Sequence, residues 1–166
     1  MPASGTNILP MIPVKPPPLL PCFDRSNPAP GLTEDHFRAV FAYLYVDAPW
    51  YATLPKGKAL EVRFRPRHFE HAFFKEPAKG RARTVWQKDR AERILWIGYT
   101  VENAVEVRKV GEARFTFFCR MADREAPWFV VVTNLMAGAL DFVTAYPLDS
   151  HGYVQARSTG VMVFRR

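Results

Sequence analysis

The sequence predicts an α+β domain in which helices pack on a four-stranded antiparallel β-sheet meander, preceded by a proline-rich N-terminal arm. Helix-like apolar spacing is found in the first half of the chain, and strand-like segments with short connections fill the second half. Nine of the fifteen prolines lie within residues 1–30. With 166 residues, of which 48% are apolar, the chain can bury the core of one domain.

The prolines predict where the domain begins. Proline lacks a backbone N–H and favours an extended, polyproline-like path, most clearly at Pro16-Pro17-Pro18. We therefore expect residues 1–32 to form an arm, either an unstructured leader or a segment that lies over a partner. Residues 33–166 are expected to form a single α+β domain.

Two segments have the spacing of amphipathic helices, residues 33–46 and 89–100. In the first, Thr33 is a suitable N-cap, and two acidic residues follow where the helix dipole favours anions. Between the helices, residues 61–65 alternate like a short strand, residues 68–75 are predicted to form one or two helical turns, and residues 76–84 a basic loop.

The four predicted strands of the meander are joined by short connections, as antiparallel neighbours require. Alternation places Arg114, Thr116 and Arg120 on one face of the second strand. In the fourth strand it places Phe142, Thr144 and Tyr146 on one face. The strands span Val105–Val110, Arg114–Met121, Trp128–Leu135 and Leu140–Pro147.

The charge of the domain favours a polyanionic partner. The chain has a net charge of +7, and residues 61–166 carry 18 Lys and Arg against 12 Asp and Glu. Nucleic acid is the commonest polyanion that such a surface attracts. No apolar run is long enough for a transmembrane helix, so no membrane association is expected. Two cysteines, Cys22 and Cys119, are too few for a disulfide framework and indicate thiols in the cytoplasm.

Familiar cofactor and metal motifs are not found in the sequence. It contains no GxxxxGK[ST], GxGxxG or GxSxG pattern. The sequence therefore does not indicate a phosphate-binding loop, a dinucleotide-binding fold or a hydrolase with a nucleophilic serine. His68 and His71 are three residues apart, whereas a helical zinc pair usually needs a spacing of four, and no cysteine cluster accompanies them. We therefore expect neither a metal nor a cofactor.

What remains is a group of side chains suited to acid–base chemistry. Helical spacing places His68, His71 and Lys75 on one face of the predicted turns. Histidine can donate or accept a proton at pH 7, and a nearby cation can stabilise a phosphorane. RNA cleavage by its own 2′-hydroxyl needs these parts. Two ordinary, partly exposed histidines remain the alternative interpretation.

The order of these segments resembles the barnase–EndoU–colicin–RelE superfamily of small metal-independent ribonucleases, most of all its branch in phages and polymorphic toxins. The residues that carry the resemblance are His68 and His71, a helix such as Arg90–Ile97, and a final strand Val143-Thr-Ala-Tyr-Pro147. It covers residues 60–150. The resemblance implies helices on an antiparallel sheet and a 2′,3′-cyclic phosphate product.

By this resemblance, the catalytic histidine is His68 or His71, and the late hydroxyl residues are Thr144 and Tyr146. The cation is Lys75, Arg90 or Arg120. Independently of the resemblance, the strand face shared by Arg114, Thr116 and Arg120 leads us to expect that these residues bind substrate. The sequence thus predicts a metal-independent endoribonuclease of a toxin or mobile element, with RNA as substrate and an antitoxin or assembly protein as a possible partner. A non-catalytic nucleic-acid-binding or assembly module is the alternative, and an effector that acts on a nucleotide is a third.

Overall fold

The computed structural model describes residues 13–24, 26, 30–54 and 57–165. Its strands fall into a large sheet and a small one. The large sheet contains β1 (Trp50–Thr53), β2 (Ala59–Arg63), β5 (Glu106–Val110), β6 (Arg114–Arg120), β7 (Trp128–Met136), β8 (Ala139–Leu148) and β9 (Val161–Arg165). The small sheet pairs β3 (Phe74–Lys75) with β4 (Val85–Trp86).

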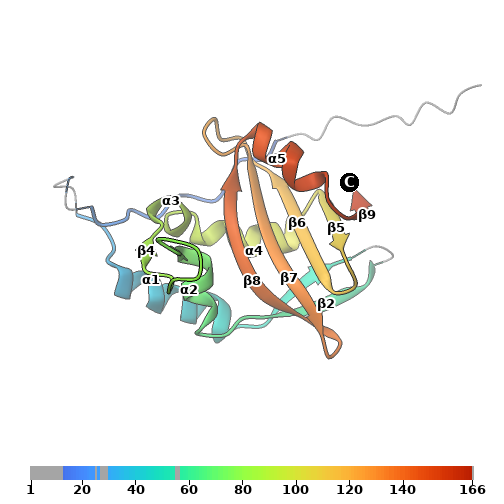
Figure 1. The fold of residues 1–166 in the computed structure, drawn as a ribbon, viewed down its shortest axis with the longest axis horizontal. Helices are drawn as coiled ribbons and strands as arrows, with labels where there is room; N and C mark the ends of the chain where they lie inside the picture. Colours follow the sequence, from blue (N-terminus) through green and yellow to red (C-terminus); the bar gives the residue numbers. More distant parts are fainter. Residues whose placement is uncertain (1–12, 25, 27–29, 55–56, 166) are drawn as a thin grey trace, which may run out of the picture.

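The large sheet is mixed and curved, and its strand order in the described residues is β1-β2-β8-β7-β6-β5-β9 (Figure 1). Every pair of neighbours is antiparallel except β2 and β8, which are parallel. The prediction of a four-stranded antiparallel sheet is therefore wrong. The four predicted strands do form a consecutive meander, β5 to β8, but three further strands extend the sheet at its two ends.

The helices are α1 (Glu34–Phe41), which continues as the π-helical η1 (Ala42–Val46), α2 (His68–Phe73), α3 (Lys88–Ala91), α4 (Ile94–Asn103) and α5 (Ser150–Arg157). The predicted helix over residues 33–46 is confirmed, and the Thr33 side chain accepts a hydrogen bond from the His36 backbone N–H. The predicted helix over residues 89–100 is interrupted between α3 and α4. β1, β9 and α5 were not expected.

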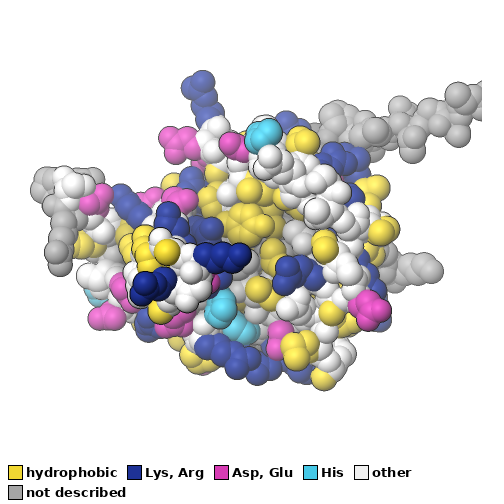
Figure 2. Space-filling model, in the orientation of Figure 1, with side chains coloured by type: hydrophobic (Ala, Val, Ile, Leu, Met, Phe, Trp, Pro, Cys, Tyr) yellow, Lys and Arg dark blue, Asp and Glu magenta, His cyan; other side chains and the backbone are white. Residues whose placement is uncertain are grey.

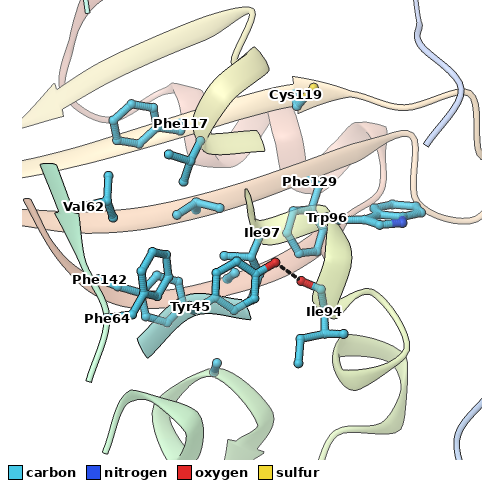
Figure 3. Packing of buried hydrophobic residues seen from close by; sticks show 14 of the residues in the cluster. Tyr45, Val62, Phe64, Ile94, Trp96, Ile97, Phe117, Cys119, Phe129 and Phe142 are labelled. Carbon is cyan, nitrogen blue, oxygen red and sulfur yellow. Dashed lines mark hydrogen bonds between the residues drawn. The ribbon is translucent and has the colours of Figure 1, made fainter. Parts of the chain in front are cut away.

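The main core lies between one face of the large sheet and α1, η1, α2 and α4 (Figure 3). Phe41 is 1% exposed and contacts the rings of five aromatic residues, which tie α1 to α2 and to β8. The hydroxyl of Tyr45 donates a hydrogen bond of 2.6 Å to the Ile94 carbonyl, which joins η1 to α4. The core thus fixes α2 against the sheet.

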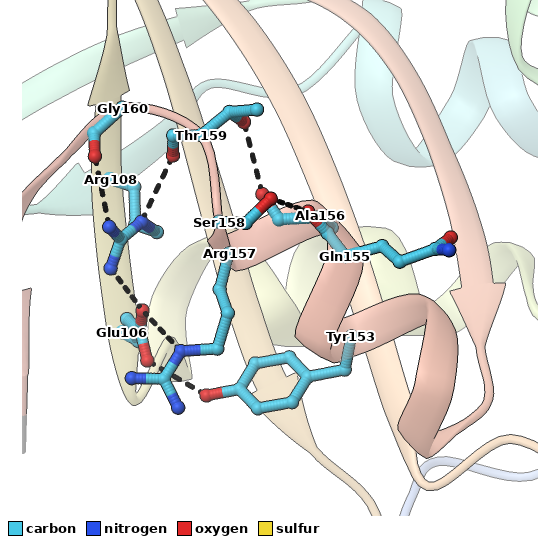
Figure 4. Close-up of polar contacts among 9 residues, drawn as sticks. All are labelled: Glu106, Arg108, Tyr153, Gln155, Ala156, Arg157, Ser158, Thr159 and Gly160. Carbon is cyan, nitrogen blue, oxygen red and sulfur yellow. Dashed lines mark hydrogen bonds and ion pairs between the residues drawn. The ribbon is translucent and has the colours of Figure 1, made fainter.

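A second, smaller cluster lies on the opposite face of the sheet, beneath α5. Tyr153 of α5 stacks on Trp128 at 3.5 Å between ring centroids, and its hydroxyl donates to the buried Glu106 carboxylate at 2.8 Å (Figure 4). Arg108 pairs with the same carboxylate at 2.9 Å and also donates to the carbonyl oxygens of Thr159 and Gly160. This network holds α5 and the following turn onto the sheet.

The described part of the N-terminal arm packs on the domain itself. The Trp96 indole N–H donates to the Pro17 carbonyl at 2.8 Å, and the Leu20 N–H donates to the Glu92 carbonyl at 2.9 Å. Val14 bridges to Met121 at the end of β6. These contacts attach residues 13–24 to the end of α3, to α4 and to the end of β6. Residues 1–12, and with them two of the nine clustered prolines, lie outside the described residues.

Candidate functional site

Polar side chains gather on the part of the sheet that α5 leaves uncovered. Strand register places them in three rows across β6, β7 and β8. We call this surface the open face, and it consists of Arg114, Asn134 and Asp141 in the first row, Thr116 and Thr144 in the second, and Tyr146 in the third. The other members of the last two rows, Val132, Phe118 and Val130, are buried in the cluster beneath α5. On this side of the molecule, an apolar floor is surrounded by Lys, Arg and His side chains (Figure 2).

A β-bulge in β8 decides which residues reach the open face. The register shifts between Val132 and Thr133 of the partner strand, so that Val143 is the extra residue. The prediction that Phe142 shares a face with Thr144 and Tyr146 is therefore wrong. Phe142 is 1% exposed in the main core. Asp141 takes a place on the open face instead.

Helix α2 meets the open face at His71. The Thr144 hydroxyl donates a hydrogen bond of 3.1 Å to the His71 carbonyl, while the exposed His71 imidazole lines a hollow of about 390 Å³ beside β8. Because a threonine has a single O–H donor, Thr144 uses it to position α2 in this structure. Thr144 therefore meets the histidine turn through the backbone carbonyl of His71 and not through its imidazole.

His68 occupies a different environment from His71. It is 6% exposed, its ring lies 5.8 Å from the ring of Phe142, and its Nδ1 accepts a hydrogen bond of 3.1 Å from the Arg65 N–H. Burial, together with the charge of Arg67, lowers the pKa of His68 to about 4. The ring is therefore neutral at pH 7 with its proton on Nε2. The hydrogen bond that its Nδ1 accepts from the Arg65 backbone suits a structural role.

The lowered pKa of His68 predicts a loss of stability in weak acid. As the pH falls below the ordinary value of 6.5, the unfolded chain takes up a proton that the folded chain refuses until about pH 4. The contribution of neutral His68 to the free energy of unfolding is therefore complete above pH 6.5 and is lost as the pH falls towards about 4. The loss amounts to up to about 3 kcal/mol. Urea unfolding at pH 7 and pH 4.5 measures this loss, and His68→Asn, whose side-chain oxygen can replace Nδ1 as acceptor, should make it smaller. An equal loss in both proteins would contradict the assignment.

The other end of the open face is cationic. The Arg90 guanidinium lies over the Tyr146 ring at 5.4 Å from the centroid, and its Nη1 donates to the Ala72 carbonyl at 3.5 Å. Burial raises the pKa of Tyr146, although the charges of Arg90 and Arg114 oppose this effect, so the phenol keeps its proton at pH 7. Arg90 thereby links α3, α2 and β8 with a positive charge beside a neutral hydroxyl donor.

Two predicted site residues lie apart from this group. Lys75 belongs to β3 and pairs with Val85, so it does not share a helical face with the two histidines as expected. Arg120 lies in the row of Trp128 and Leu148, where the indole of Trp128 stacks on Tyr153. The α5 helix therefore covers the sheet between Arg120 and Thr116.

The sequence reasoning missed Asp141 and Asn134, which both line the hollow beside His71. Asp141 is 6% exposed, and its Oδ2 accepts a hydrogen bond of 3.2 Å from Arg65. Its Oδ1 is buried without a hydrogen-bond partner among the described residues. An Asp in a strand-like segment was a visible signal, but strict alternation from Thr144 would place it on the opposite face, because the bulge is not visible in the sequence.

Comparisons with protein-family models, with curated proteins and with solved structures find no match to this chain. Within the described ranges, no group of three or more His, Cys, Asp or Glu residues is arranged to hold a metal ion. No helix in the part of the chain that the structure describes has both the length and the apolar character that a membrane crossing requires. The function must therefore be argued from the open face itself.

Proposed function

We propose that the protein is a metal-independent endoribonuclease whose active site is the open face together with His71. One observation carries this proposal. The Thr144 hydroxyl holds the His71 backbone against β8, which places a solvent-accessible imidazole at the edge of a surface that also carries Tyr146, Arg90 and Arg114. These are the proton-transfer group and the positive charges that cleavage by a 2′-hydroxyl requires.

Each side chain has a distinct role in the proposed reaction. The His71 imidazole accepts the proton of the 2′-hydroxyl while the 2′-oxygen forms a bond to phosphorus. The bond from phosphorus to the 5′-oxygen breaks, and that oxygen takes a proton from solvent, leaving a 2′,3′-cyclic phosphate. The guanidinium groups of Arg90 and Arg114 stabilise the charge on the phosphorane, and the Tyr146 phenol donates a hydrogen bond to a phosphate oxygen. Thr144 acts as a positioning residue.

A second function, RNA binding without cleavage, is favoured by the environment of His68. That ring is buried and neutral, so only His71 of the predicted pair is exposed for proton transfer. The arginines of the open face would bind phosphates in either case. In a pure binding protein, affinity should fall steeply between about 50 and 200 mM salt while the RNA stays intact.

Incubation with labelled RNA in EDTA tests the proposal. We expect cleavage of tRNA or mRNA into fragments that end in a 2′,3′-cyclic phosphate, and no cleavage of single-stranded DNA, which lacks the nucleophile. Tight, salt-sensitive binding to RNA that remains intact would support the second function instead. RNA that is neither cut nor bound would contradict both.

A further inference from the structure

We propose that residues 15–21 of the N-terminal arm are a preformed ligand for a partner protein, which binds Lys15, Pro18 and Pro21 in a groove lined with Trp and Tyr side chains. The partner binds the arm where it lies, without lifting it from the domain. The arm contributes no residue to the open face, so this surface is independent of the proposed nuclease.

The arm has the periodicity of a polyproline helix. Proline fixes φ near −65° and favours a left-handed path with three residues per turn. Burial along the arm repeats with the same period. The half-buried side chains that face the domain are those of Val14, Pro17 and Leu20. The exposed side chains of the next row are those of Lys15, Pro18 and Pro21. A strand would instead alternate every second residue.

The inward row holds the arm in place. Val14 and Leu20 pack against the main core. The Trp96 indole N–H donates to the Pro17 carbonyl at 2.8 Å, and the Leu20 N–H donates to the Glu92 carbonyl at 2.9 Å. Because the domain already orders this segment, a partner would not lose affinity by having to order it. The outward row is therefore presented as a rigid ligand.

The outward row defines the chemistry of the groove. Proline has no N–H to donate, and the Pro18 carbonyl accepts no hydrogen bond within the part of the chain that the structure describes. A partner must therefore offer flat apolar surface together with hydrogen-bond donors. Trp and Tyr side chains supply both, and grooves lined with aromatic residues bind Pro-x-x-Pro segments in SH3 and WW domains.

Lys15 adds a charge requirement at one end of the groove. Its exposed side chain comes three residues before Pro18, so it lies one turn away, about 9 Å along a polyproline helix. An Asp or Glu of the partner at this distance from the first proline pocket would complement the ammonium group. A row with one cation and two proline rings suits a protein groove better than a polyanion such as RNA.

Purified SH3 domains that differ in the acidic residues beside their grooves are the probes, and each is titrated with the full chain by calorimetry. We expect the domains with an acidic groove to bind. Pro18→Ala should weaken this binding by about tenfold or more, since it removes an apolar ring from the interface. The matched control, Pro17→Ala, removes the same ring from the inward row, keeps the carbonyl that Trp96 binds, and should leave the affinity unchanged.

Amide hydrogen exchange determines whether the arm stays on the domain in the complex. The Leu20 N–H, which donates to the Glu92 carbonyl, should be as protected in the complex as in the free chain. Loss of this protection on binding would overturn the inference, because the partner would then bind a detached arm. Equal loss of affinity in Pro17→Ala and Pro18→Ala, or a set of probes in which no domain binds the chain, would overturn it as well.

Discussion

Replacing His71 with alanine should reduce RNA cleavage by about 100-fold to 10,000-fold, the range that a general acid–base group contributes. The substitution removes the imidazole that takes the proton from the 2′-hydroxyl. It keeps the backbone carbonyl that accepts the Thr144 hydrogen bond, so α2 should stay in place. Initial rates on labelled RNA in EDTA measure the effect, and thermal unfolding verifies that the variant folds.

His151→Ala is the matched control for this prediction. His151 is an exposed histidine on α5, where its Nε2 lies 3.0 Å from the Gln155 amide nitrogen. The variant also loses one imidazole ring, but from α5 and not from α2. Its cleavage rate should therefore match that of the unaltered protein. Equal rates for all three proteins would remove His71 from the mechanism.

Phe41→Ala should lower the free energy of unfolding by about 3–5 kcal/mol, the usual cost of removing a buried phenylalanine ring. Phe41 is 1% exposed and contacts Tyr45, Phe64, Phe69, Phe73 and Phe142, so a cavity here loosens the packing of α2 on β8. Because α2 carries His71, cleavage should fall as well, even at temperatures where the variant remains folded. Urea unfolding measures the stability loss.

Tyr43→Ala provides the comparison for Phe41→Ala, since Tyr43 follows in η1 but its side chain is 75% exposed. It should change the free energy of unfolding by no more than about 0.5 kcal/mol, as surface substitutions usually do. A Phe41→Ala protein as stable as the Tyr43→Ala protein would contradict the packing described for α2.

The segments with strong local signals could be predicted from the sequence, but the extent of the sheet could not. Thr33 and the apolar spacing after it predicted α1, and alternation with short turns predicted β5 to β8. The strand predicted at residues 61–65 is present as β2, yet it joins the sheet beside β8 through only Val62 and Arg63. Such a distant parallel pairing leaves no local pattern. The Asp149 N-cap of α5 was a visible signal that the sequence reasoning did not use.

The candidate site was predicted in part for a similar reason. Thr144, Tyr146, Arg114 and Thr116 share the open face, because ordinary alternation holds along most of β6 and β8. Asp141 was missed because one extra residue in β8 reverses the alternation, and a bulge depends on the partner strand. Helical spacing alone also could not show that α2 ends at Phe73, which separates Lys75 from the two histidines.

The most direct test of the account compares two copies of one RNA oligonucleotide that differ only at the nucleotide where the protein cuts. One copy is entirely RNA, and the other has a 2′-deoxyribose at that nucleotide, which removes the nucleophile and leaves every other contact in place. With EDTA present, we predict that the first copy is cut to a 2′,3′-cyclic phosphate and that the second is bound but stays whole at this position. Cleavage of both copies at the same bond, or of neither, would contradict the mechanism proposed for the open face.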